Sequence, residues 1–202
     1  MMGKLPGFLL RALAPALVCG GAIAGEESLP DFETCMNSEV ARYERALSAL
    51  KARQVEKPLL DIAGVGGVEF CGTVGIVRCD RSEDRIGCQR DLAAVQDSLR
   101  SVVLQNLQAP SDPVEDRTGF ADRLYRRVLA LAHGRSAGPD CAGADTLHEV
   151  WCEARQANAR LRLAVLAWQV ARFLDRAAPA VAAGWAEAAA PIRPKARPEV
   201  QP

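Results

Sequence analysis

Three cysteines, Cys71, Cys79 and Cys88, fall within eighteen residues and lead directly into an amphipathic stretch. In that stretch apolar residues recur at the spacing of one helical face: Leu92, Val95, Leu99, Val102, Val103 and Leu107. This arrangement predicts covalent cross-links at one end of a domain of packed helices. It constrains the fold strongly, but it contains no catalytic motif.

The first 24 residues have the pattern of a signal peptide. A short positive start precedes an apolar run too short to span a bilayer, and Ala22-Ile23-Ala24 has small residues where signal peptidase reads them. We therefore expect cleavage after Ala24 and a single helical domain over residues 25–190. Lipoprotein processing at Cys19 is the alternative, although Val18 stands where a small residue normally precedes the cysteine.

Charge and hydropathy narrow the range of partners. Residues 25–190 carry 20 basic and 24 acidic side chains, a mildly acidic balance. Nucleic-acid binding would need a basic face, and four arginines interrupt the longest apolar stretch, at 146–176. The four interrupting arginines are Arg155, Arg160, Arg162 and Arg172. The sequence thus predicts neither a nucleic-acid partner nor a membrane span. The tail over 191–202 contains four prolines, and we expect it to be disordered.

Six cysteines remain after the expected cleavage: Cys35, Cys71, Cys79, Cys88, Cys141 and Cys152. An even number in an exported chain favours disulfides, because the periplasm and the extracellular space are oxidising. Zinc is the competing interpretation, but none of these cysteines forms a C-x2-C pair. We predict disulfides and no metal site.

Chain geometry selects a pairing among these cysteines. A first helix of about twenty residues carries the chain roughly 30 Å from Cys35. The thirteen or so residues that follow Pro58 span at most about 45 Å, which is enough to bring Cys71 back beside Cys35. Cys79 and Cys88 enclose a polar turn, and Cys141 lies just before the helix that contains Cys152. We predict Cys35–Cys71, Cys79–Cys88 and Cys141–Cys152, with Cys35–Cys88 and Cys71–Cys79 as the alternative.

Hydrophobic periodicity predicts an all-α bundle of about four helices. They run from Asn37 or Ser38 to Lys57, over 83–108, from Asp116 or Thr118 to His133, and from Thr146 to about Arg176. The third helix should bury Phe120, Leu124, Val128 and Leu131. The fourth should be capped by Thr146 and Glu149, which have the spacing of a capping box.

Residues 58–79 lack a helical period. Gly64-Val65-Gly66-Gly67 is followed by alternating apolar residues, which indicates an irregular glycine-rich insert or a short β-ribbon. A phosphate-binding loop would need a following Gly-Lys-Ser/Thr, which is absent from the sequence.

Candidate catalytic residues are few. His148 and Cys152 lie four residues apart on a predicted helix and could pair chemically, but oxidation of Cys152 would remove that role. Trp151 and Trp168 could mark a binding surface, although we expect both to face the core. The sequence contains no Gly-x-Ser-x-Gly elbow and no C-x-x-C motif. We therefore predict no catalytic residues and no cofactor.

Two segments together resemble a known family. Cys88 begins the run Cys-Gln-Arg-Asp-Leu-Ala-Ala-Val-Gln-Asp-Ser-Leu, and Cys141 precedes a turn at Gly143 and a helix containing Cys152, Arg160 and Leu163. This resembles the LprI-type lysozyme-inhibitor proteins of the bacterial envelope. The resemblance implies a small, disulfide-stapled helical module with a protein partner, either a lysozyme or another cell-wall enzyme.

Two classes of function follow from these observations. The first is a secreted or periplasmic binding protein, for which a mildly acidic body would favour encounter with a cationic lysozyme. The alternative is a periplasmic enzyme with a carboxylate site that no motif marks. The sequence does not identify the binding surface.

Overall fold

The computed structural model describes residues 29–53, 65–108, 119–134, 141–143 and 145–188, which form five α-helices and no strand. In chain order these are α1 (Phe32–Ala52), α2 (Val65–Asp80), α3 (Arg85–Gln105), α4 (Phe120–His133) and α5 (Thr146–Phe173). The expected signal peptide (1–24) and proline-rich tail (191–202) lie outside the described residues. An all-α fold stapled by disulfides is confirmed, with one more helix in the described part than the sequence predicted.

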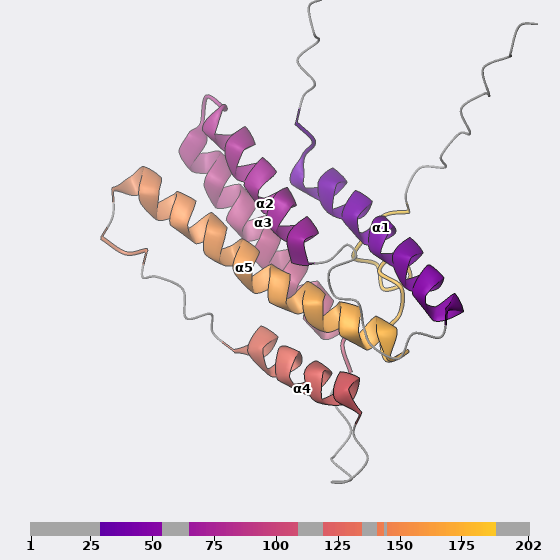
Figure 1. Cartoon of the computed structure of the whole chain (residues 1–202). Helices are drawn as coiled ribbons and strands as arrows, with labels where there is room; N and C mark the ends of the chain where they lie inside the picture. Colours follow the sequence, from indigo (N-terminus) through magenta and orange to yellow (C-terminus); the bar gives the residue numbers. More distant parts are fainter. Residues whose placement is uncertain (1–28, 54–64, 109–118, 135–140, 144, 189–202) are drawn as a thin grey trace, which may run out of the picture.

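The other helices are arranged around α5, which is 28 residues long (Figure 1). The α2–α3 pair packs on one side of α5 and α4 packs on the other. Most of the buried residues of α5 are alanines and valines, and they are spread over several faces of the helix. This distribution explains its weak amphipathic pattern, because a helix with neighbours on several sides is apolar on several sides. The remaining helix, α1, packs mainly on α2.

The glycine-rich stretch is α2, so the prediction of an irregular or β-ribbon insert is wrong for residues 65–79. Residues 58–64 lie outside the described part. Glycine in a helix interior costs about 1 kcal/mol relative to alanine, and the sequence pattern therefore argued against a helix. Close packing compensates: a Cβ on Gly75 would lie 3.0 Å from Leu92 Cδ1, and one on Gly72 would lie 2.2 Å from Asn158 Cγ. The glycines allow α3 and α5 to approach α2 closely.

Aspartates begin three of the helices, and none of the three was predicted as a cap. α1 starts at Phe32 rather than near Asn37, because the Asp31 carboxylate accepts a hydrogen bond of 2.7 Å from the Thr34 backbone N–H. Asp145 rather than Thr146 caps α5, and Asp84 caps α3. Aspartate caps as well as serine or asparagine does. Where several such residues adjoin, the sequence alone does not select the first helical turn.

Trp168 is the centre of the main core. It is fully buried on α5, and its ring centroid lies 5.2 Å from that of Tyr43 and 4.8 Å from that of Trp185. The Tyr43 hydroxyl donates to the Gln169 carbonyl at 2.7 Å, which ties α1 to α5. Since Trp185 lies beyond α5, the chain that follows the last helix also closes the core.

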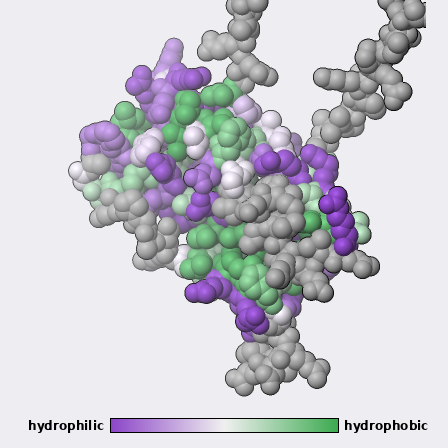
Figure 2. Space-filling view, in the orientation of Figure 1, coloured by the Kyte–Doolittle hydropathy of each residue, from purple (hydrophilic) through white to green (hydrophobic). Residues whose placement is uncertain are grey.

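A smaller apolar cluster joins α4 to α5. Its centre is Tyr125, fully buried, whose hydroxyl donates to the Gln108 carbonyl at 2.6 Å. Val128 is buried as predicted, but Phe120 and Leu131 are exposed, so the predicted face of this helix is partly wrong. Figure 2 shows apolar residues gathered over α4 on the visible face. None of the helices in the described ranges combines the length and apolarity that a bilayer crossing requires.

Candidate functional site

The six predicted disulfide cysteines form three bonds in the structure. Cys35–Cys71 joins α1 to α2, Cys79–Cys88 joins α2 to α3, and Cys141–Cys152 joins a loop to α5. This is the pairing that chain geometry favoured, and the alternative pairing is wrong. Because Cys152 is oxidised, it forms no thiolate pair with His148, which instead lies exposed beside the Asp145 carboxylate.

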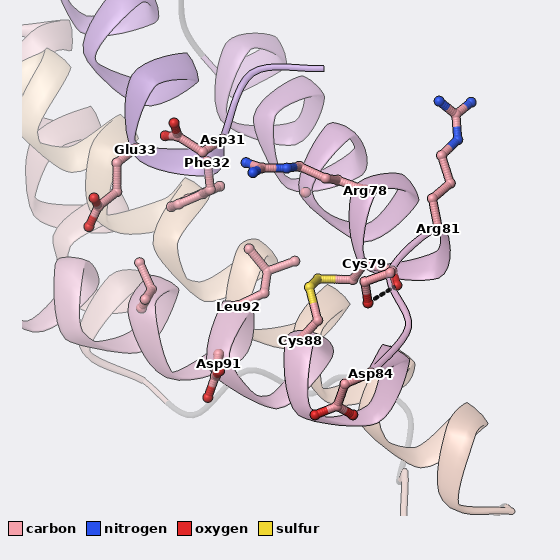
Figure 3. Close-up of a pocket in the computed structure, with 13 residues that line it drawn as sticks. Asp31, Phe32, Glu33, Arg78, Cys79, Arg81, Asp84, Cys88, Asp91 and Leu92 are labelled. Carbon is pink, nitrogen blue, oxygen red and sulfur yellow. Dashed lines mark hydrogen bonds between the residues drawn. A yellow bond between two sulfur atoms is a disulfide. The ribbon is translucent and has the colours of Figure 1, made fainter. Parts of the chain in front are cut away.

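A groove lies where the start of α1, the end of α2 and the start of α3 meet (Figure 3). We call it the corner groove; its volume is about 850 Å³. Phe32, Leu92 and Val95 supply its apolar surface, next to the Cys79–Cys88 disulfide. The groove is therefore formed by three helix ends, and the Cys35–Cys71 and Cys79–Cys88 bonds connect the three helices.

Charged side chains form the rim of this groove: Asp31, Glu33, Arg78, Arg81, Asp84 and Asp91. Two of the acids also cap helices, and the backbone N–H of Thr34 lowers the pKa of the Asp31 carboxyl. Arg78 points toward Asp31, whereas Arg81 points away from the groove (Figure 3). The other two acids, Glu33 and Asp91, are exposed and cap no helix. With four carboxylates against two guanidinium groups, the rim carries a net negative charge.

Apart from the aromatic side chains, the buried polar side chains in the described ranges are amides: Gln89, Gln96, Asn158 and Gln169. No carboxylate or histidine in these ranges is buried. General acid–base catalysis is favoured by a titratable group whose pKa is shifted by burial, and the corner groove offers none of this kind. Nor are His, Cys, Asp and Glu side chains of the described part grouped as metal ligands would be.

The three tryptophans do not share one environment. Trp168 and Trp185 are buried, but Trp151 is exposed on α5, so the prediction that Trp151 faces the core is wrong. Seventeen residues separate Trp151 from Trp168, and at about 100° per residue the two lie roughly 100° apart around the helix.

Sequence reasoning missed the corner groove. The start of α1 is far in the chain from the end of α2 and the start of α3, and α2 belongs to the glycine-rich segment that was not predicted as a helix. The available signal was the polar turn between Cys79 and Cys88, which predicted where α3 begins but not what lies opposite. No protein-family model matches this chain, and comparisons with curated proteins and with solved structures find no significant match.

Proposed function

We propose that this chain is an exported binding protein that holds a cationic protein in its corner groove, and that the partner is a lysozyme or another cell-wall hydrolase. The observation that carries the proposal is the groove itself: an apolar floor beside a disulfide, surrounded by a rim with an excess of carboxylates.

Export is supported by the covalent chemistry and by the sequence. Three disulfides persist in an oxidising compartment and are rare in the cytosol. The small residues up to Ala24 match a signal-peptidase site. Intact-mass measurement of the secreted or periplasmic protein should give a chain that begins at Gly25. A diacylglyceryl-modified Cys19 at the N-terminus would contradict this.

The groove suits a basic side chain from a partner. Phe32 and Leu92 would contact the aliphatic stem of an inserted Lys or Arg, while Glu33 and Asp91 would lie near its charged end. A charged rim mainly accelerates encounter, and desolvation of the apolar floor mainly lengthens the lifetime of the complex. The cationic surface typical of lysozymes would complement this rim.

The test is inhibition of lysozyme-driven lysis of cell-wall suspensions, followed by turbidity at low salt. The mature protein should slow lysis, and added salt should weaken the effect because it screens the attraction. The double variant Glu33→Gln/Asp91→Asn keeps both helix caps and should weaken inhibition about tenfold.

The matched control is Glu149→Gln/Glu153→Gln on α5, which removes the same number of charges away from the corner groove. If the control weakens inhibition equally, net charge rather than the groove is responsible. If a large molar excess of the wild-type protein does not slow lysis, the proposal that the corner groove binds lysozyme is wrong.

A further inference from the structure

A second groove runs between α2 and α5 and shares no lining residue with the corner groove. Each helix contributes residues at positions i, i+4, i+7 and i+11, which form one stripe on a helix. The stripe on α2 is Glu69, Thr73, Ile76 and Asp80, and the stripe on α5 is Trp151, Arg155, Asn158 and Arg162. The volume of this α2–α5 groove is about 530 Å³, which is within the range of small-molecule sites.

An incompletely bonded amide lies in the α2–α5 groove. The Asn158 side chain packs against Gly72, and the residue is 8% exposed, yet its Oδ1 accepts no hydrogen bond. One turn further along α5, Arg162 donates to Glu69 at 2.6 Å, but its Nε–H has no acceptor. Buried polar groups in folded proteins are normally bonded. Both atoms lie just beneath the surface of the groove, so they indicate a ligand that supplies a donor and an acceptor when these two side chains rotate toward it.

The opposite end of the groove has an accessible aromatic ring. Trp151 is 36% exposed, and the Arg155 guanidinium carbon lies 4.8 Å from its ring centroid. Trp168 and Trp185 are buried in the core, but Trp151 is not. Core packing therefore does not explain the position of Trp151. Tryptophan combines a large apolar surface with a polar N–H, which suits amphipathic ligands.

The charges of the α2–α5 groove balance, unlike those of the corner groove. Two carboxylates, Glu69 and Asp80, face two guanidinium groups, Arg155 and Arg162. A groove without net charge does not select an ion. Planar carboxylate, amide and guanidinium groups offer paired donors and acceptors, which match the neighbouring hydroxyls of a neutral sugar.

We propose that the α2–α5 groove binds an N-acetylated sugar. The acetamide N–H of the ligand would satisfy Asn158 Oδ1, its carbonyl would accept from Arg162, and its apolar ring face would contact Trp151. This site is independent of the proposed lysozyme partner, because the two grooves have no residue in common.

The experiment titrates the mature protein with chitotetraose and, in parallel, with cellotetraose. These two oligosaccharides differ at C2 of each sugar, which carries an acetamide in chitotetraose and a hydroxyl in cellotetraose. Chitotetraose should bind saturably and change the emission of the exposed Trp151, with an affinity about tenfold above that of cellotetraose, as expected for one buried hydrogen bond. Equal affinity for the two sugars, or no binding of chitotetraose, would overturn the proposal.

Three variants assign the binding to the groove. Trp151→Ala should abolish the emission change and weaken binding measured by calorimetry. Asn158→Leu should reduce the affinity for chitotetraose to that for cellotetraose. If this variant fails to fold, Gly72→Ala tests the same contact. The Cβ of that alanine would lie 2.2 Å from Asn158 Cγ and would displace the amide. The control Glu33→Gln/Asp91→Asn should bind chitotetraose as wild type does. Undiminished binding by Trp151→Ala would contradict the assignment.

Discussion

Replacing Gln96 with methionine should stabilise the protein. Gln96 lies on α3 with no exposed surface, and both polar atoms of its amide lack a hydrogen-bond partner. A buried polar group without a partner costs about 1–3 kcal/mol. Methionine is similarly long and unbranched, and it adapts to irregular gaps, so the substitution removes the amide without opening a large cavity.

We expect Gln96→Met to raise the free energy of unfolding by about 1–3 kcal/mol. For a domain of this size each kcal/mol corresponds to about 2–4 °C in Tm. Urea unfolding followed by tryptophan fluorescence measures the change, with the slope of the transition unaltered if the folded and unfolded states are otherwise the same.

Gln89→Met is the matched control on the same helix, seven residues earlier. Gln89 is equally buried, but its Nε2 donates to the Ile76 carbonyl at 3.2 Å and to Asp80 Oδ1 at 3.1 Å. Only its oxygen lacks a partner. The Gln96 variant should therefore be the more stable of the two by at least about 2 kcal/mol. If it is the less stable, the Gln96 amide is hydrogen-bonded in solution and the reasoning is refuted.

Two further predictions concern a cross-link and a buried phenol. Replacing both Cys35 and Cys71 with alanine opens a 36-residue loop and should lower the free energy of unfolding by about 4 kcal/mol. The same change at Cys79 and Cys88 opens a 9-residue loop and should lower it by about 2.5 kcal/mol. Equal losses of stability in guanidinium unfolding would contradict the loop-length argument. Burial raises the pKa of Tyr43 above its ordinary value, so the unfolded state ionises first and stability should fall as pH rises above about 10. Tyr43→Phe should lose less stability than wild type between pH 8 and pH 11, and an identical loss would show that other groups cause it.

The sequence was most informative where a helix has a single periodic apolar face. On α3, Leu92 and Val103 lie in the core as the amphipathic pattern predicted. The cysteine pairing was also predictable, because short chain segments restrict which sulfur atoms can meet. Both arguments rest on local geometry, which a single sequence contains.

Elements that meet several neighbours could not be predicted in this way. The glycines of α2 disfavour a helix locally, and the closeness of Leu92 and Asn158 that compensates for them exists only in the folded protein. The α4 helix is turned so that Tyr125 rather than Phe120 is buried, because contact with α5 decides between two apolar faces. The corner groove and the α2–α5 groove both depend on α2, so neither could be located from the sequence.

The position of α5 in the chain has a consequence for how this protein reaches its native state. During synthesis the N-terminal helices emerge first, but the surface on which most of them pack arrives only with residues 146–173. The hydrogen bond from Tyr43 to Gln169, for example, joins residues 126 positions apart, and contacts at such separations slow folding. The Cys35–Cys71 and Cys79–Cys88 bonds, in contrast, need only the first 88 residues. These two cross-links can therefore form without the helix that completes the core.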